Sequence, residues 1–160
     1  MHRPLDRIDF ELLAMLQNDA RRSNKELAAA VDLAPSACLA RVQRLRQAGI
    51  LRGFHADVEP QALGIGVQAM ISVRLRQHGR AKVRAFWKRL SALKEIRAIF
   101  HVTGAHDFLV HVAARDIAHL RDLALDAFTN REDVAHIETS IVFEHFANPI
   151  APRLESPEAP

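Results

Sequence analysis

Arginines and small side chains gather in one N-terminal stretch, where together they could bind a nucleic acid. Arg41 and Arg44 are three residues apart, so a helix would place them side by side. Residues 35–55 hold four arginines and no acid. Ser36 and Ala37 would allow close approach to base edges, while the arginines bind phosphate or guanine. The pattern favours DNA binding, but the arginines could also merely solvate the outer face of a helical bundle.

Two predicted helices precede this stretch. Apolar residues recur at helical spacing from Leu5 to Leu16, which predicts a helix over about 6–18. Ser23 and Glu26 have the spacing of a capping box, which would start a short second helix.

The third predicted helix begins at Pro35, which suits a first helical position, and ends at Gly49. Its inward residues are expected to be Leu39, Val42 and Leu45, and Cys38 is expected to pack rather than react. Arg52-Gly53 and its apolar neighbours suggest a tight β wing. Such a helix-turn-helix reads DNA through its last helix. The candidate DNA-contacting residues are Ser23, Asn24, Ser36, Ala37, Arg41, Arg44 and Arg52.

The second half of the chain has strand periodicity. Apolar and polar residues alternate in four segments: 67–75, 96–102, 108–112 and 137–143. Helical spacing over 83–93 and 116–128 separates the first pair and the last pair of these strands. The order is the ferredoxin-like βαββαβ pattern, so we predict an α+β protein. The expected parts are a winged helix-turn-helix with linker strand (1–60), a ferredoxin-like domain (61–147) and a Pro-rich, extended or frayed tail (148–160).

One face of the predicted sheet lacks covering helices. It is expected to mix apolar and polar residues, namely Met70, Ile99, Leu109 and Val142 with Gln68, His101, His111 and Ser140. This mixture favours a homodimer formed through the sheet, because pairing buries apolar surface. A solvated face with scattered apolar residues is the alternative.

Charge is unevenly distributed along the chain. Residues 74–97 hold nine basic residues against one acid, a net charge of +8, whereas residues 107–144 hold eight acids against three arginines, a net of −5. The two predicted helices of this half could therefore pair their charges, which weakens the case for a second DNA surface on residues 80–94.

Several motifs in order resemble the Lrp/AsnC family of bacterial transcription regulators. They are Leu5-Asp6-Arg7-Ile8-Asp9, Asn18-Asp19-Ala20-Arg21, Ser23-Asn24-x-Glu26-Leu27-Ala28, Pro35-Ser36-Ala37-Cys38-Leu39-x-Arg41-Val42-x-Arg44-Leu45 and Val102-Thr103-Gly104-Ala105-His106-Asp107-Phe108. The resemblance implies a winged helix-turn-helix joined by a short strand to a ferredoxin-like domain. It also implies double-stranded DNA as partner, dimers that assemble into tetramers or octamers, and an amino acid or related metabolite as effector.

Two positions depart from the family pattern. Ala34 stands where relatives usually carry a serine, and loss of that N-cap hydroxyl typically costs about 1 kcal/mol, unless Asp32 or Ser36 compensates. The segment His106-Asp107-Phe108 replaces a second acid and a tyrosine, so the effector's identity stays open.

The resemblance also implies an effector pocket between subunits, near residues 104–107. A free amino acid needs acceptors for its ammonium and donors for its carboxylate, which a carboxylate side chain and turn amides supply. The alternative is that Gly104 and Asp107 only build a hairpin turn. The candidate effector-binding residues are Gly104, Ala105, His106, Asp107, Thr139 and Ser140.

Other classes of protein find little support in the sequence. The nine histidines lack paired metal-ligand spacing, and no nucleophile–base motif or phosphate loop is present, so we expect neither a metal, a cofactor nor an enzyme. One cysteine and the absence of a long apolar run indicate a cytoplasmic protein. The leading hypothesis is a sequence-specific, metabolite-responsive regulator. The alternatives are an architectural DNA-wrapping protein and a metabolite-binding or enzymatic domain with an oligomerising N-terminal bundle.

Overall fold

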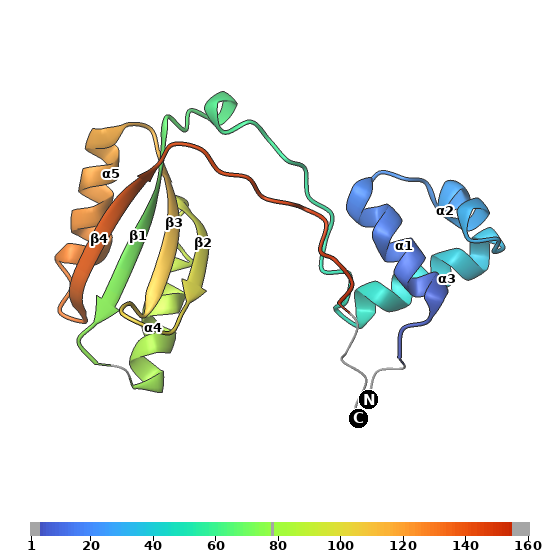
Figure 1. Ribbon diagram of the computed structural model, residues 1–160, viewed down its shortest axis with the longest axis horizontal. Helices are drawn as coiled ribbons and strands as arrows, with labels where there is room; N and C mark the ends of the chain where they lie inside the picture. Colours follow the sequence, from blue (N-terminus) through green and yellow to red (C-terminus); the bar gives the residue numbers. More distant parts are fainter. Residues whose placement is uncertain (1–3, 78, 155–160) are drawn as a thin grey trace. The chain divides into compact units, whose positions relative to one another are not determined.

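The computed structural model describes residues 4–77 and 79–154, and the chain divides into two compact units (Figure 1). The N-terminal unit contains the residues up to Asp57 together with those from Phe146 onward. The sheet unit contains Val58–His145. The chain therefore leaves the N-terminal unit once and returns to it near the C-terminus.

The N-terminal unit contains the three predicted helices, α1 (Arg7–Asn18), α2 (Asn24–Ala30) and α3 (Pro35–Gln47). The predicted capping box is confirmed: the Ser23 hydroxyl accepts from the amide of Glu26, whose carboxylate accepts from the amide of Ser23. The same arrangement of Asp6 and Asp9 starts α1. The buried core of this unit consists of Leu12, Leu16, Leu27, Ala28, Val31 and Cys38.

The inward side of α3 differs from the prediction at one position. Cys38 is fully buried and packs in the core, as expected, whereas Leu39 is 46% exposed. The inward stripe is Cys38, Val42 and Leu45, at helical spacings of four and three residues. Leu39 lies one residue beyond this stripe and is therefore rotated by about 100° toward solvent.

The predicted tight β wing around Arg52-Gly53 is wrong, because residues 51–59 form no strand. The amides of Ile50 and Leu51 both donate to the carbonyl of Leu45, so they close the end of α3 instead of starting a hairpin. The following segment has no regular secondary structure up to the short 3₁₀ turn Pro60–Leu63.

The described part of the tail has no regular secondary structure, and it contacts α1. The amide of Ala151 donates to Oε1 of Gln17 at 2.7 Å. The guanidinium of Arg153 lies 4.1 Å from the centre of the Phe10 ring, within the range of a cation–π contact. These contacts make residues 151–154 part of the N-terminal unit.

The sheet unit has the predicted order of elements. They are β1 (Val67–Leu75), α4 (Arg80–Leu90), β2 (Ile96–His101), β3 (Phe108–Ala114), α5 (Ile117–Ala124), a π-helical turn (Leu125–Thr129) and β4 (Val134–Val142). The strands are antiparallel in the order β2-β3-β1-β4, with α4 and α5 against one face (Figure 1). The predicted α+β, ferredoxin-like fold is confirmed. Phe86, Phe108 and Phe128 are fully buried between helices and sheet.

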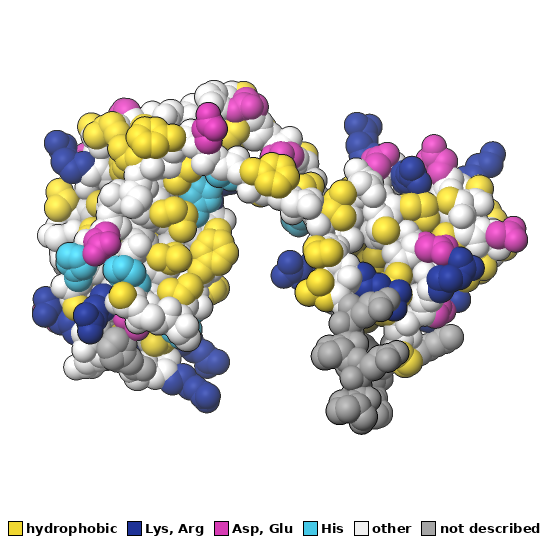
Figure 2. All heavy atoms as spheres, in the orientation of Figure 1, with side chains coloured by type: hydrophobic (Ala, Val, Ile, Leu, Met, Phe, Trp, Pro, Cys, Tyr) yellow, Lys and Arg dark blue, Asp and Glu magenta, His cyan; other side chains and the backbone are white. Residues whose placement is uncertain are grey.

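The helix-free face of the sheet carries a mixed set of side chains, and Figure 2 shows hydrophobic and histidine side chains over this unit. Paired strand residues place there Gln68, Met70, Ser72, Ala98, Phe100, Leu109, His111, Ser140 and Val142. The prediction was wrong for Ile99 and His101, which pair with residues of the helix-covered face. The pairing of β2 with β3 shifts register between Ile96 and Ala98, and one extra residue reverses which side chains face the helices.

Candidate DNA-binding and effector-binding sites

The turn between α2 and α3 is held by polar side chains near its two ends. The side-chain amide of Asn24 donates to the carbonyl of Pro35 at 2.7 Å, which joins the start of α2 to the start of α3. The Ser23 hydroxyl is used in its capping box, and its hydrogen bonds lower the pKa of Glu26. Ser23 therefore fixes the start of α2, and Asn24 fixes the start of α3.

The outward face of α3 carries small and amide side chains. Ser36 and Ala37 are exposed in the first turn, as a helix that approaches base edges requires. Opposite the buried stripe, exposed residues recur at spacings of four, three and four: Ser36, Ala40, Gln43 and Gln47. The sequence reading missed Gln43 and Gln47, although the helical period counted from Cys38 and Leu45 would have placed them outward.

Arg41 and Arg44 lie on the flank of α3 that faces α1, where they bind a buried carboxylate. Asp9 is only 1% exposed and accepts hydrogen bonds from Nη2 of Arg44 at 2.6 and 2.7 Å and from Nη1 of Arg41 at 2.9 Å. Arg41 also donates to Asp6 at 2.7 Å, and this hydrogen bond raises the pKa of Arg41. We call Asp6, Asp9, Arg41 and Arg44 the arginine clamp, because they fasten α3 to α1.

The clamp leaves the arginines a limited exposed surface. The side chain of Arg41 is 23% exposed and that of Arg44 is 37% exposed. The structure therefore gives both a structural role and leaves part of each guanidinium open to solvent.

A shallow basic cleft lies near the C-terminal end of α3. It has a volume of about 540 Å³ and is lined by Gln43, Arg46, Gln47, Leu51 and Arg52. Arg52 is fully on the surface, as expected of a phosphate-contacting residue.

The start of α3 lacks a side-chain cap, and neither Asp32 nor Ser36 replaces it among the described residues. Burial raises the pKa of the Cys38 thiol in the first turn of this helix, which is consistent with the packing role.

In the sheet unit, Asp107 fixes the end of β1. Its Oδ2 accepts from the amide of Leu75 at 2.7 Å, and its own amide donates to the carbonyl of Val73 at 2.9 Å. Gly104 has φ +113°, a conformation that favours glycine. These contacts build the turn, and they also fix the geometry of its exposed backbone.

The remaining effector candidates separate within one protomer. His106 lies beside β4, with Nε2 3.8 Å from Oε2 of Glu138. Thr139 pairs with Ile71 on the helix-covered face, whereas Ser140 pairs with Met70 on the open face. Of the two candidates on β4, only Ser140 therefore lies on the same face of the sheet as His106. Glu138, which was not a candidate, lies closer to His106 than Ser140 does in the strand order. Strand alternation puts Glu138 and Ser140 on one face, a signal that the sequence reading left unused.

Two histidines, His111 and His145, lie close together in the sheet unit. His111 and His145 have ring centres 5.8 Å apart, and burial, followed by the charges of His145 and Arg97, lowers the pKa of His111. Among the described residues, no three His, Cys, Asp or Glu side chains gather as metal ligands would. No helix in the described part of the chain is long and apolar enough to span a membrane.

Comparison with known families matches both units. Residues 5–52 match the winged helix-turn-helix DNA-binding family, and residues 68–149 match the Lrp/AsnC ligand binding domain. The chain belongs to the Lrp/AsnC family. The resemblance read from the sequence is thus confirmed, and this Lrp/AsnC protein is a transcription regulator with a DNA-binding and a ligand-binding domain, not an enzyme.

Individual relatives agree with this assignment. The HTH-type transcriptional regulator AldR of Mycolicibacterium smegmatis is 43% identical over 143 residues, covering 89% of this chain and 84% of AldR. The crystal structure of MtbAldR is 36% identical with a TM-score of 0.76, and the match covers 92% of this chain and all of that one. A transcriptional regulator from Neisseria meningitidis, solved as an L-Met complex, is 30% identical with a TM-score of 0.82, covering 90% and 93%.

Proposed function

We propose that this Lrp/AsnC regulator reads operator DNA with the outward face of α3 and changes its assembly when an amino acid or related metabolite binds the sheet unit. The observation that carries the proposal is the exposed row of small and amide side chains on α3, namely Ser36, Ala40, Gln43 and Gln47. The arginine clamp and the Asn24–Pro35 hydrogen bond hold this helix in a fixed orientation. Fixed side chains support sequence discrimination because base contacts depend on geometry.

Within this proposal, the candidate DNA-binding residues divide into three kinds. Ser36, Ala37 and Gln43 approach base edges, and glutamine can donate to and accept from adenine. Arg44 and Arg52 contact phosphate. Ser23, Asn24 and Arg41 mainly position α2 and α3. The sequence suggested direct DNA contact for all three, and the proposal gives them this positioning role instead.

We propose that the open sheet face forms the homodimer. Phe100 is 50% exposed there and pairs with Leu109, Met70 lies on the same face two strands away, and apolar burial contributes roughly 25 cal/mol per Å². Two recognition helices of a dimer would then enter successive major grooves about 34 Å apart. Further assembly into tetramers or octamers is what the family resemblance implies. Because its partner is genomic DNA, we place the protein in the cytoplasm.

The effector pocket is proposed at the turn 104–107, completed by a neighbouring subunit. Support comes from the exposed backbone around Gly104 and from His106, Glu138 and Ser140 on the adjoining open face. The L-Met complex of the Neisseria meningitidis relative supports an amino acid as the ligand class. Asp107 is held at β1, so its role is to shape the turn as well as to offer a carboxylate.

Two measurements test the proposal. Binding to an operator fragment selected from the source genome is compared with binding to random duplex of equal length; a preference on the order of 10³-fold supports a specific regulator. Equal affinity would favour the architectural alternative, and no affinity at low salt would reject DNA binding. Calorimetry with the twenty amino acids, repeated on Asp107→Ala, then tests the pocket; unchanged binding by that variant would remove Asp107 from it.

A further inference from the structure

All the charged side chains of helix α4 are basic, and its exposed surface also carries Trp87 and two alanines. It contains five cations and no acid: Arg80, Lys82, Arg84, Lys88 and Arg89. Phe86 and Leu90 are buried against the sheet, so the cations occupy the outer surface and its flanks. Ala81 and Ala85 lie between them, and such small side chains allow a partner to approach the helix closely. We call the surface of Arg80, Arg84 and Lys88 with these alanines the α4 face.

Most of these cations have no partner among the residues that the structure describes. In the described part of the protein, only Arg89 forms an ion pair, donating to Asp133 at 2.9 and 3.4 Å. Its guanidinium also lies 5.1 Å from the centre of the Phe86 ring. The side chains of Arg80, Arg84 and Lys88 make no hydrogen bond or ion pair with any described residue.

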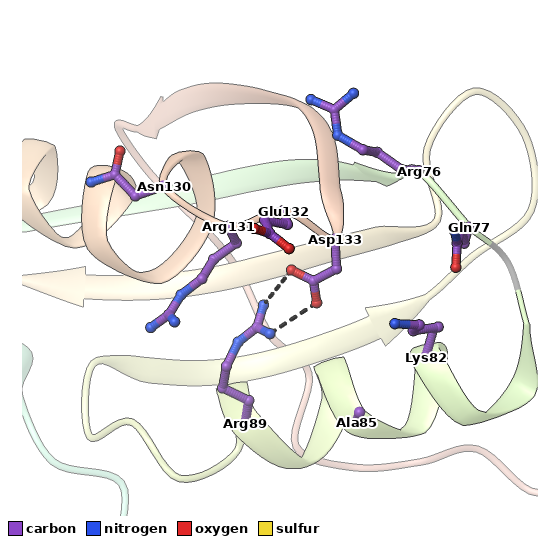
Figure 3. A pocket seen from close by; sticks show the side chains of 9 residues that line it. All are labelled: Arg76, Gln77, Lys82, Ala85, Arg89, Asn130, Arg131, Glu132 and Asp133. Carbon is purple, nitrogen blue, oxygen red and sulfur yellow. Dashed lines mark hydrogen bonds and ion pairs between the residues drawn. The ribbon is translucent and has the colours of Figure 1, made fainter.

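A cleft of about 530 Å³ extends the basic surface beside α4. Lys82 and Arg89 enter it from α4, and Figure 3 shows Arg89 joined to Asp133 across it. Arg76 and Arg131 add two more cations to its lining. The lining also includes Glu132 and Asp133, so four cations against two acids leave the cleft with a net positive charge beside the outer side of α4.

The acidic half of the chain does not neutralise this surface. Asp116 caps α5, Asp122 pairs with its neighbour Arg121, and Asp133 is the partner of Arg89. Glu138 faces histidines on the open side of the sheet. The sequence-based expectation that the two helices pair their charges is thus wrong for the α4 face, and the described residues offer no acidic stripe of matching length.

This arrangement is unfavourable for an isolated helix. Like charges four residues apart, as in Arg80, Arg84 and Lys88, each destabilise a helix by about 0.2–0.5 kcal/mol. Cations in the first turn also oppose the helix dipole. A bound polyanion removes both penalties.

We propose that the α4 face binds the phosphate backbone of duplex DNA, as a contact separate from α3. The proposal rests on the proposed function, which already makes DNA the partner. Cations four residues apart advance about 6 Å along the helix, and each DNA strand carries a phosphate every 3.4 Å or so of axis, so one helix can meet several phosphates. Because these contacts read no bases, they would add affinity without sequence preference.

The test uses the full-length protein and a 60-base-pair duplex carrying the selected operator. The variant Arg80→Gln/Arg84→Gln/Lys88→Gln removes the α4 face. The control Lys94→Gln/Arg115→Gln/Arg121→Gln removes the same net charge from exposed cations elsewhere in the sheet unit. Affinity is measured over a salt series, and circular dichroism and sedimentation check fold and assembly.

Each phosphate contact contributes about 0.9 to the slope of log K against log[salt], so the α4 variant should lower the slope by up to about 2.7 and weaken binding at least tenfold or so at 0.1 M salt. The control should keep the wild-type slope. An unchanged slope in the α4 variant, an equal loss in the control, or a changed sedimentation profile would overturn the inference. If the wild type itself binds no duplex, the proposed function fails instead. A single Arg84→Glu variant repeats the test should the triple variant not fold.

Discussion

The arginine clamp permits a quantitative prediction about the N-terminal unit. Asp9 is buried and accepts hydrogen bonds from both Arg41 and Arg44, so either arginine alone still neutralises it. We predict that Arg41→Ala and Arg44→Ala each lower the free energy of unfolding of this unit by about 2 kcal/mol, the usual cost of losing a hydrogen bond to a charged group.

Removing both arginines should cost more than the sum of the single changes. The double variant leaves the Asp9 carboxylate buried without a cation, and breaking a buried pair in this way costs about 3–5 kcal/mol. Because domains are stable by only about 5–15 kcal/mol, the unit should then be close to unfolding. Adding Asp9→Leu to the double variant should restore part of the loss, since it removes the stranded charge but also the Asp9 half of the capping box of α1.

The assay is urea denaturation followed by two signals. Far-ultraviolet circular dichroism reports the helices of both units, whereas fluorescence of Trp87, the single tryptophan of the chain, reports the sheet unit alone. The fluorescence transition should stay at the wild-type midpoint in all variants, and the sheet-mediated dimer should persist. Strictly additive single and double effects, or no recovery with Asp9→Leu, would refute the reasoning, because both outcomes mean that Asp9 does not depend on the arginines.

Three further predictions concern the sheet unit. Leu109→Glu places a charge at the centre of the open face and should convert dimers to monomers in sedimentation equilibrium; an unchanged profile would argue against the sheet interface. Burial, with His145 and Arg97 nearby, lowers the pKa of His111 in the folded protein. As the pH falls, this histidine is therefore protonated in the unfolded chain before it is protonated in the folded one. Its contribution to the free energy of unfolding is complete above about pH 6.5 and should be lost as the pH drops through the lowered pKa. Urea titrations at pH 7.5 and 5.5 measure this loss, which should be smaller in His111→Phe; an equal loss would assign it to other groups. Gly104→Ala should lower stability by about 1–3 kcal/mol, seen as a reduced Tm, because φ +113° strains a side-chain-bearing residue; an unchanged Tm would show that the turn relaxes.

Much of the fold follows from periodicity and capping. The alternation of strands 67–75 and 137–143 and the Ser23–Glu26 box predicted real elements, because these patterns depend on neighbours a few residues away. The sequence predicted Ile99 and His101 on the open face, where the structure has Ala98 and Phe100. One extra residue in β2 reverses the strand alternation, and such a bulge has no recognisable pattern of residue types.

The site was predicted less completely, and the arginines show why. Residue type and spacing indicated that Arg41 and Arg44 lie side by side on a helix. They did not indicate that both bind the buried carboxylate of Asp9, which lies more than thirty residues earlier in the chain. Aspartate at that position reads as an ordinary first-turn residue. Long-range pairing of this kind depends on tertiary geometry, and so does the separation of Thr139 from Ser140 across the sheet.

The return of the C-terminal segment to α1 has a consequence for how the two units are tethered. Two stretches of backbone, near Asp57–Val58 and near His145–Phe146, run from one unit to the other. A protease that nicks only the first stretch would separate the helical fragment from the rest of the chain, and only the docked C-terminal segment, with its contacts at Ala151 and Arg153, would then join that fragment to the rest. A nick in the second stretch would leave the two units covalently joined through the first, whereas a nick in the first would leave them joined only through the docked tail, so the two cuts differ in consequence.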